Sequence, residues 1–425
     1  MQNTQSLDDI LHHCLHCGLC LPVCPTYTVT LNEQSSPRGR IRLMKEVFEQ
    51  NMEIGSSFVD EMYFCLDCQA CQTICPAGVQ YGELVEEARW KISQQGKEPF
   101  MQRLIKSAAL NILRTKWKTK TWASLLRAYR STGLQEAVQQ SGILSLFSEQ
   151  LHQRQFLMPD VASQPFDSSS QERYMPASKV RGRVAFLSGC IMNVAFAQIH
   201  RDAIDVLLAN GFEVIIPGNQ QCCGSLHSHN GEMEQAKELA RANIDAFLRH
   251  DFDALVIDSA GCGAFIKEYG KALADDPQYA EQAKTLSAKT KDISEFLASI
   301  ELIPPARPVR KRITYHEACH LVHTQKISAQ PRALLKSIPG IEFVELPEAT
   351  WCCGSAGIYN ILRYDDSMHM LERKMNNVAT TNAEIVVTAN PGCHLQLQYG
   401  IKKFGLKMEV MHPVSLLARS CKNVE

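Results

Sequence analysis

The chain has 425 residues, of which 45% are hydrophobic and 21% charged, as expected for a globular protein of several domains. Its 44 basic and 45 acidic residues give a formal net charge of −1, which argues against a nucleic-acid partner because such binders are strongly basic. The polar start at Met1–Ile10 lacks the layout of an export signal, and no apolar run approaches the roughly 18 residues of a membrane span. We therefore expect a cytoplasmic chain that touches a membrane only peripherally, on its inner face, or through a partner.

The chain contains 17 cysteines, and an odd number in an unexported protein disfavours a disulfide framework. Eight of them occur in two runs, CLHCGLCLPVCP and CLDCQACQTICP, which both read C-x2-C-x2-C-x3-C-P. The first run holds Cys14, Cys17, Cys20 and Cys24, and the second holds Cys65, Cys68, Cys71 and Cys75. This spacing is that of bacterial ferredoxins with two 4Fe–4S clusters.

In this pattern, three closely spaced thiolates hold one cluster and the fourth cysteine, next to proline, reaches the other cluster. One cluster is therefore predicted to bind Cys14, Cys17, Cys20 and Cys75. The other is predicted to bind Cys65, Cys68, Cys71 and Cys24. Two structural zinc ions are the alternative for eight thiols, but zinc sites use separated CxxC pairs rather than this run occurring twice.

The sequence around these motifs favours helices. Ile41–Gln50 and Glu83–Ser93 have helical periodicity, so we expect residues 1–95 to form an all-helical ferredoxin-like module. The stretch SPRGRIRL places three arginines close together, namely Arg38, Arg40 and Arg42. They either begin a solvated helix after a proline, offset the charge of a cluster, or bind a partner.

Residues 96–180 are predicted to form a basic helical segment followed by a linker. Lys97–Arg130 contains nine basic residues, two tryptophans and one acidic residue, Glu98. This composition agrees with three interpretations: the basic face is solvated, it docks on another subunit, or it contacts an anionic membrane. The stretch Gln153–Ser178 is rich in serine and other polar residues, which is typical of a linker.

The second half contains an internal repeat, with one unit predicted at 181–305 and the other at 310–425. Four cysteines match at offsets of 129 to 131 residues: Cys190 with Cys319, Cys222 with Cys352, Cys223 with Cys353, and Cys262 with Cys393. Such constant offsets indicate a duplicated domain.

Each unit alternates apolar and helical segments. Val184–Leu187, Val214–Ile216 and Ala254–Ile257 are suited to buried parallel strands, and Glu232–Leu248 has a helical pattern. This alternation predicts a three-layer α/β unit. The cysteines follow the carboxyl ends of the strands, where ligands bind in open α/β sheets, so we expect the four thiols of each unit to converge.

The role of these converging thiols is open at this point. They are candidates for a further iron–sulfur cluster or a dithiol redox site, and buried cysteines also pack simply as small hydrophobic residues. The second unit adds His316, His320 and His323 around Cys319. These histidines are candidates for metal ligands or proton carriers, and equally for helix caps or surface residues.

The stretches SPRGRIRLMKEV, GCGAFIKEYG, WCCGSAGIYN and VTANPGC, with the cysteine framework, resemble iron–sulfur subunits of bacterial glycolate oxidase (glycolate dehydrogenase) over nearly the whole chain. In that family a two-cluster ferredoxin module precedes two cysteine-rich CCG domains. The framework alone is also similar to subunits of anaerobic glycerol-3-phosphate dehydrogenase, lactate-utilisation complexes and heterodisulfide reductase. The resemblance implies that the eight N-terminal cysteines are cluster ligands.

The resemblance further implies flavin-containing partner subunits that oxidise glycolate or D-lactate, while this chain passes electrons towards a membrane acceptor such as quinone. No GxGxxG follows a strand, so we expect FAD on the partners only and no catalytic residue for the hydroxy acid on this chain. In heterodisulfide reductase a fifth thiolate binds an unusual cluster, and this chain has Phe265 and Gln396 at the corresponding positions. This difference argues against a five-thiolate cluster here. The alternatives are thiol–disulfide or quinone chemistry at a CCG site, and a zinc-bound scaffold.

Overall fold

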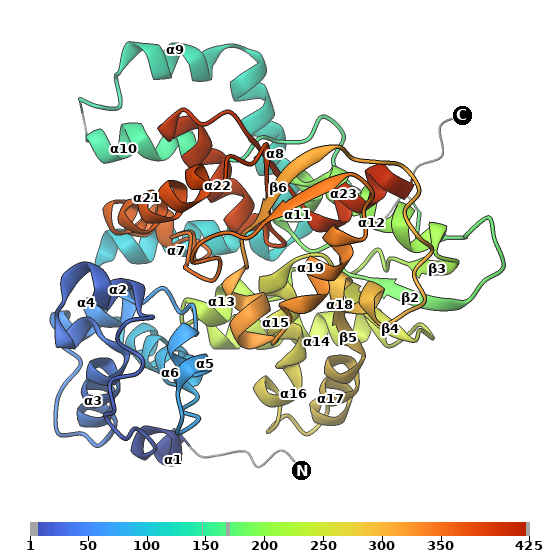
Figure 1. Cartoon of the computed structure of the whole chain (residues 1–425). Helices are drawn as coiled ribbons and strands as arrows, with labels where there is room; N and C mark the ends of the chain where they lie inside the picture. Colours follow the sequence, from blue (N-terminus) through green and yellow to red (C-terminus); the bar gives the residue numbers. More distant parts are fainter. Residues whose placement is uncertain (1–6, 147, 167–170, 422–425) are drawn as a thin grey trace.

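The computed structural model describes residues 7–146, 148–166 and 171–421. Figure 1 shows a helical N-terminal region at one end of the molecule and two units with β-sheets beside it. The first six residues of the predicted polar start and residues 167–170 of the predicted linker lie outside the described part of the chain.

The N-terminal region is built from short helices. Its elements are α1 (Leu7–His12), α2 (Pro25–Thr30), η1 (Glu33–Ser35), α3 (Pro37–Phe48), α4 (Ser56–Phe64), α5 (Ala70–Ile74) and α6 (Tyr81–Gln94). Helices α3 and α6 confirm the two helices predicted from periodicity. Helix α3 begins where it does because the Ser36 side chain accepts a hydrogen bond from the Gly39 amide and Pro37 occupies the first turn.

A second group of helices connects this region to the sheets: α7 (Phe100–Arg114), α8 (Lys116–Ser131), α9 (Leu134–Ser141), α10 (Glu149–Arg154) and the 3-10 turn η2 (Gln155–Leu157). Part of the predicted linker is structured rather than free. Phe166 is buried and its amide donates to the Asn193 carbonyl at 2.8 Å. Strand β1 (Arg173–Tyr174) then pairs with the edge of the first sheet.

The two sheets have the same order of equivalent strands. The first runs β1-β3-β2-β4-β5, with β2 (Gly182–Phe186), β3 (Phe212–Ile215), β4 (Ala254–Ile257) and β5 (Thr290–Asp292). The second runs β7-β6-β8-β9, with β6 (Lys311–Tyr315), β7 (Ile341–Val344), β8 (Ile385–Val387) and β9 (Glu409–Met411). All strand pairs except the one involving β1 are parallel. The predicted strands and the duplication are therefore confirmed.

Helices separate the strands in both units. The first unit contains α11 (Ile191–Ala195), α12 (Ala197–Ala209), α13 (Ser225–His229), α14 (Met233–Phe247), α15 (Ala260–Lys267), α16 (Tyr269–Ala272), α17 (Ala280–Lys289) and α18 (Ile293–Ala298). The second contains the π-helical turn η3 (His320–Thr324), α19 (Ala329–Lys336), α20 (Tyr359–Leu362), α21 (Tyr364–Thr380), α22 (Pro391–Phe404) and α23 (Pro413–Cys421). Helix α14 confirms the helix predicted over 232–248.

The two units share one hydrophobic core. Val184 and Ile204 of the first unit belong to the same buried cluster as Ile313 and Leu417 of the second. Burial of apolar surface between the units fixes their relative position, because each Å² removed from water contributes about 25 cal/mol. The N-terminal region has a separate core.

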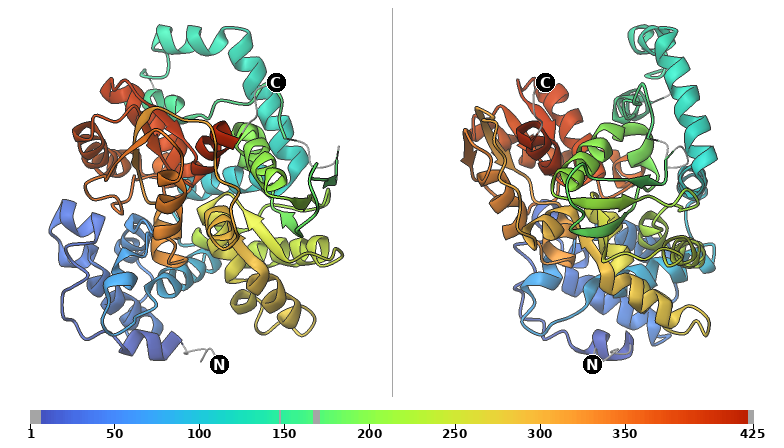
Figure 2. Two further views of the ribbon diagram at one scale, coloured as in Figure 1. Left: turned by 45° about the vertical axis from the view of Figure 1, so that its right-hand side comes forward. Right: turned by 90° about the vertical axis from the view of Figure 1, so that its right-hand side faces the viewer.

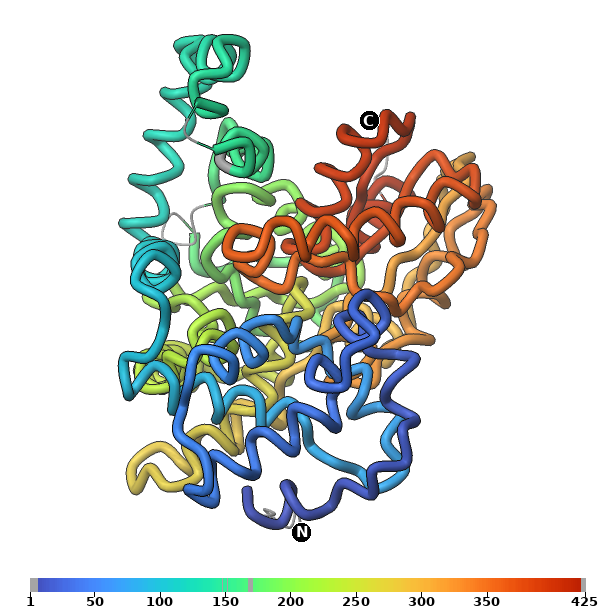
Figure 3. Tube along the Cα trace, turned by 90° about the vertical axis from the view of Figure 1, so that its left-hand side faces the viewer, coloured from blue at the N-terminus to red at the C-terminus, as the bar shows by residue number. Residues whose placement is uncertain are grey.

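The N-terminal region nevertheless packs against both units. Figures 2 and 3 show its helices (blue) at the lower end of the molecule, next to the yellow and orange segments. Arg89 donates to the His229 carbonyl of the first unit at 2.7 Å, and the Tyr359 hydroxyl of the second unit donates to the Phe64 carbonyl at 3.2 Å. The three parts therefore meet around one central region.

Candidate metal centres

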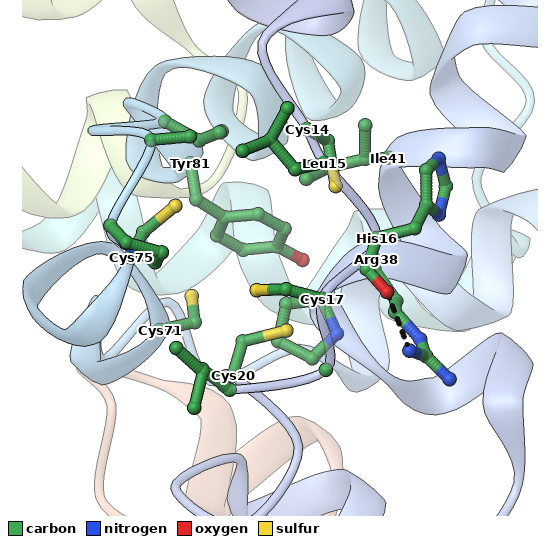
Figure 4. A pocket seen from close by; sticks show the side chains of 16 residues that line it. Cys14, Leu15, His16, Cys17, Cys20, Arg38, Ile41, Cys71, Cys75 and Tyr81 are labelled. Atoms are coloured by element: carbon green, nitrogen blue, oxygen red, sulfur yellow. Dashed lines mark hydrogen bonds between the residues drawn. The ribbon is translucent and has the colours of Figure 1, made fainter.

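The first set of predicted cluster ligands lines one cavity near the surface. Cys14, Cys17, Cys20 and Cys75 surround it, as Figure 4 shows, although Cys75 is far from the others in sequence. Arg38 also lines this cavity and donates to the His16 carbonyl at 3.0 Å, which braces the loop that carries the first three cysteines.

The second set lines a neighbouring, more buried cavity. Its lining includes Cys24, Cys65, Cys68 and Cys71. Cys71 lines both cavities, so the two sites adjoin each other. The structure thus places Cys75 with the thiols of the first run and Cys24 with those of the second, while the assignment of ligands to each cluster stays a prediction.

Arg40 is a buried cation beside the second cavity. Its side chain is fully shielded from solvent and donates to the Glu61 carbonyl at 2.8 Å, to the Glu61 carboxylate at 3.1 Å and to the Ser35 carbonyl at 2.8 Å. Burial by itself lowers the pKa of Arg40, but Tyr81, Cys65, Cys24 and Glu61 outweigh it and raise the pKa overall. Arg40 therefore places a permanent positive charge where anionic thiolates would gather.

The other two arginines of the stretch differ from Arg40. The Arg42 side chain is 64% exposed and pairs with Glu46 one turn along α3. Arg38 is partly exposed and forms an ion pair with Glu33 at 2.6 Å. The sequence left several interpretations of these arginines open. The buried position of Arg40 agrees with charge compensation, and the exposed position of Arg42 agrees with a solvated helix face.

The thiol spacing fits a cluster better than a single ion. Among the described residues, only two groups of three ligand atoms lie within 4.8 Å of one another, and neither contains an N-terminal cysteine. Four thiolates around zinc, each about 2.3 Å from the ion, would have to lie closer together than this limit. Burial also raises the pKa of Cys68 and Cys71 well above the usual thiol value, so their thiolates need a nearby cation such as cluster iron.

The four cysteines of the first repeat also converge. Cys190 follows β2, Cys222 and Cys223 follow β3, and Cys262 lies in the first turn of α15. The Sγ atoms of Cys190 and Cys222 are 3.5 Å apart. Hydrogen bonds from the neighbouring thiols, Cys190 first, lower the pKa of Cys222 well below the usual thiol value. This unit therefore contains a close thiol pair in which the pKa of one member, Cys222, is depressed.

The second repeat has the same arrangement of cysteines, but the pKa values of its thiols differ from those of the first repeat. Cys353 and Cys393 lie with His316 in a buried group whose ligand atoms are within 4.8 Å of one another. The hydrogen bond with Cys352 and burial raise the pKa of Cys319 well above the usual value. The hydrogen bond with Cys319 by itself lowers the pKa of Cys352, but Cys353 and burial outweigh it and raise this pKa well above the usual value. The second unit therefore lacks the depressed thiol pKa of the first.

Glycines after the paired cysteines let the backbone turn tightly. Gly224 has φ +91° and Gly354 has φ +87°, conformations that favour glycine. A Cβ on Gly354 would lie 2.5 Å from the Ser367 carbonyl oxygen, so no side chain fits there without a shift of backbone.

Both thiol groups face one shared cavity of about 500 Å³. The hydrogen bond from the Gly261 amide to the Asn390 side chain, at 3.1 Å, joins the two units beside this cavity. Cys65, a predicted ligand of the second cluster, lines the cavity as well. The thiols therefore converge at the carboxyl ends of the strands, as predicted, and those of both repeats line one cavity together with residues of the N-terminal region.

The three histidines of the second unit have different surroundings, and none is a surface residue. His316 is buried, and neither ring nitrogen has a hydrogen-bond partner among the described residues. Nδ1 of His323 lies 3.0 Å from the Thr73 hydroxyl, so this side chain contacts the N-terminal region. His320 lines the shared cavity, and burial lowers its pKa to about 3.

Sequence reasoning missed Asp67 and His229, which line this cavity, and Glu86, which contacts His229. The His229 ring donates to Glu86 at 2.5 Å and lies 3.1 Å from the Asp67 carboxylate. Burial opposes the charged form of His229, but Glu86 and Asp67 outweigh it and raise its pKa well above the usual value. The position of Asp67 inside CLDC was the only local signal for this group.

The basic helices are largely engaged within the chain. Lys106 is buried and contacts Glu98 at 2.5 Å and Glu232 at 2.7 Å. Lys116 donates to the Gly218 carbonyl at 2.9 Å, and Arg114 pairs with Glu238. Apolar side chains such as Trp117 remain exposed on α8. Within the described residues, no helix combines the length and apolar character needed to cross a bilayer.

Known families match most of this framework. Residues 10–79 match the 4Fe-4S dicluster domain, residues 184–267 and 313–398 each match the cysteine-rich domain, and residues 101–158 match the linker region of the glycolate oxidase iron–sulfur subunit. The family matches indicate iron–sulfur clusters in the N-terminal region, and the donor sets described above fit them.

Similar proteins extend over nearly the full length. A probable glycolate oxidase iron–sulfur subunit of Bacillus subtilis is 41% identical, over 96% of this chain and 93% of that protein. The glycolate oxidase iron–sulfur subunit of Escherichia coli is 31% identical, over 93% and 92%. Lactate utilization protein A of Shouchella clausii is 29% identical, over 55% of this chain and 98% of that protein. The resemblance inferred from the sequence is thereby confirmed, and the chain belongs to the family of glycolate oxidase iron–sulfur subunits.

Proposed function

We propose that this chain is the electron-transfer subunit of a glycolate oxidase complex. It would receive electrons from a flavin-containing partner that oxidises glycolate or D-lactate, and pass them to a membrane acceptor such as quinone. The single observation that carries the proposal is the continuity of the thiol sites. The two N-terminal cavities share Cys71, and Cys65 of the second also lines the cavity of the repeats.

The proposed ligands are the two crossed sets. Cys14, Cys17, Cys20 and Cys75 would hold one 4Fe–4S cluster, and Cys65, Cys68, Cys71 and Cys24 the other. Bound clusters of this kind would carry single electrons. The chain's own contribution is to hold the thiols in place within an all-helical module, to exclude water around the second site and to supply the Arg40 charge.

The first site is the proposed place of exchange with a partner. Cys17 is exposed, and the neighbouring Leu15 and Leu19 side chains are 73% and 50% exposed. The second site is deeper, since Cys24, Cys65 and Cys71 are buried. This gradient of burial favours docking of the flavin partner on the Cys17 loop and onward transfer towards the two three-layer CCG units.

The proposal is tested on the complex purified anaerobically with its partner subunits. Iron and sulfide are counted, and the reduced protein is studied by EPR. About eight irons per chain are expected if only the two ferredoxin-type clusters are present. Cys75→Ser and Cys24→Ser should each alter a different EPR signal, whereas Cys421→Ser, outside all the sites, should alter neither. Wild-type complex without iron, or with zinc in its place, would refute the proposal.

The first CCG unit supports a second candidate function. The 3.5 Å Cys190–Cys222 contact and the depressed Cys222 pKa are suited to thiol–disulfide chemistry or to a further cluster. The assay is the glycolate-dependent reduction of a quinone analogue, which distinguishes a functional role of these thiols from a role in packing alone. Cys223→Ala should abolish it if the CCG thiols take part, while full activity in that variant would restrict the function to the N-terminal clusters. Iron clearly above eight per chain would indicate a CCG cluster.

Contact with the inner face of the cytoplasmic membrane is proposed through α8. Trp117 and Leu125 on this helix are 65% and 66% exposed, and basic residues flank them. Co-sedimentation of the complex with vesicles containing anionic lipid should fall when Trp117 is changed to Ser. Equal binding by this variant would place the membrane contact elsewhere.

A further inference from the structure

Three polar residues from three separate parts of the chain meet at the edge of the shared cavity. Asp67 lies in the N-terminal loop between two predicted cluster ligands, His229 ends α13 of the first repeat, and His320 begins η3 of the second. One ligand atom from each lies within 4.8 Å of the other two. All three residues line the cavity.

These side chains have unused bonding capacity. Nε2 of His229, Nε2 of His320 and Oδ1 of Asp67 are buried without a hydrogen-bond partner in the described part of the chain, and Oδ2 of Asp67 lies 3.1 Å from Nδ1 of His229. The Asp67 side chain is only 3% exposed. A buried polar atom without a partner keeps its desolvation penalty uncompensated, so a cluster of such atoms points to a missing partner.

The surroundings of His229 are those of a metal ligand. Its Nδ1 donates to the Glu86 carboxylate at 2.5 Å, and the other Glu86 oxygen accepts from the Ser228 hydroxyl at 2.7 Å. Metal-binding histidines commonly donate one ring N–H to a carboxylate, which orients the ring and leaves the other nitrogen for the ion. Nε2 of His229 has no partner among the described residues and would release its proton to bind the ion in that arrangement.

Arg89 fixes two of the three ligands relative to each other. Its guanidinium donates to the carbonyl of His229 at 2.7 Å and to the carbonyl of Cys65, two residues before Asp67, at 2.5 Å. The side chain is buried, and it also donates to the Met62 carbonyl. The backbone that carries Asp67 and His229 is therefore held in place by contacts other than those of the proposed ion.

We propose that Asp67, His229 and His320 bind a zinc ion at the edge of the cavity. Two imidazole nitrogens and one carboxylate oxygen form a donor set that zinc accepts, and three protein ligands leave a fourth position for water or another oxygen ligand. This position borders the cavity that both CCG thiol groups line. The ion would also join the N-terminal region to both repeats. The site does not depend on the proposed path of electrons.

The test uses the complex purified anaerobically and exchanged into buffer containing Zn²⁺, followed by removal of loosely bound metal. Elemental analysis should find one zinc per chain in addition to the iron. Zinc X-ray absorption should show only nitrogen and oxygen ligands at about 2.0–2.1 Å, and no sulfur at about 2.3 Å. Absence of retained zinc, or zinc with sulfur ligands, would overturn the proposal.

Variants locate the ion. His229→Ala and His320→Ala should each lower bound zinc at least tenfold. His323→Ala is the matched control, because His323 lies in the same turn η3 but outside the group of three. Iron and sulfide counts should stay at the wild-type value in all three proteins, which separates loss of this site from loss of the clusters. Equal zinc retention by His320→Ala and His323→Ala would refute the assignment, and the absorption spectrum of the wild type decides the question if a variant does not fold.

Discussion

Arg40 offers a direct test of how the N-terminal module tolerates its buried charge. Replacement of Arg40 by Met removes the guanidinium but keeps much of the volume. It leaves the Glu61 carboxylate, 13% exposed, without its cation, and it removes one donor of the Ser35 carbonyl, which keeps the Thr26 hydroxyl at 2.8 Å. Removing one partner of a buried ion pair costs about 3–5 kcal/mol, because the remaining charge stays desolvated.

The matched control is Arg42→Met in the same helix. The Arg42 side chain is 64% exposed and its pair with Glu46 spans one helical turn, so this change should cost only about 0.3–0.5 kcal/mol. With a denaturant slope of about 2–3 kcal/mol per M urea, Arg40→Met should lower the midpoint by roughly 1–2 M. The midpoint of Arg42→Met should stay close to that of the wild type.

The assay follows urea unfolding by far-ultraviolet circular dichroism and by the absorbance of the iron–sulfur protein, under identical anaerobic conditions. Arg40→Lys retains the charge and should fall between wild type and Arg40→Met, because lysine lacks the planar set of donors that reaches both Glu61 and Ser35. The reduction potential is a second measurement, and it should become more negative without the Arg40 charge. Equal midpoints for Arg40→Met and Arg42→Met would refute the charge-compensation argument.

Three further predictions concern stability. Gly354 and Gly405 both have positive φ, but of the two only Gly354 lacks space for a Cβ. In urea unfolding, Gly405→Ala should therefore cost roughly 1 kcal/mol, and Gly354→Ala should destabilise the second unit by clearly more than that. Lys106→Met should cost about 3–5 kcal/mol, and adding Glu98→Gln should recover part of this loss; a double variant no more stable than the single one would contradict the buried ion pair. Burial lowers the pKa of His412 to about 4 in the folded protein, whereas the value in the unfolded chain is about 6.5. The contribution of neutral His412 to the free energy of unfolding is therefore complete above pH 6.5 and is lost as the pH falls towards 4. The urea midpoint of His412→Asn should therefore decline less than that of the wild type over this range.

The cysteine framework shows how much a local pattern can predict. The spacing of the two N-terminal runs predicted two crossed ligand sets, and the structure places Cys75 beside the first run and Cys24 beside the second, with Cys71 lining both cavities. The spacing could do so because a short loop restricts the directions of its own side chains. The matched offsets of the CCG cysteines likewise predicted a duplicated domain, and the structure shows two units with the same order of equivalent strands.

Other features were beyond the reach of local patterns. The composition of the basic helices was compatible with solvent, a membrane or a partner, and the structure buries Lys106 between two carboxylates of its own chain. The predicted linker contributes the edge strand β1 and the buried Phe166. In both cases the partner residues lie far along the chain, so no sequence window contains the interaction.

By itself, the sequence determined the thiol spacing, the repeated α/β units and the family, because each depends on spacing or periodicity within a short segment or its copy. Only the tertiary structure decided that Arg40 is buried while Arg42 is exposed, and that Asp67, His229 and His320 meet at one cavity. The physical reason is that these positions follow from how three parts of the chain, far apart in sequence, pack together. That packing depends on apolar surface distributed over the whole chain.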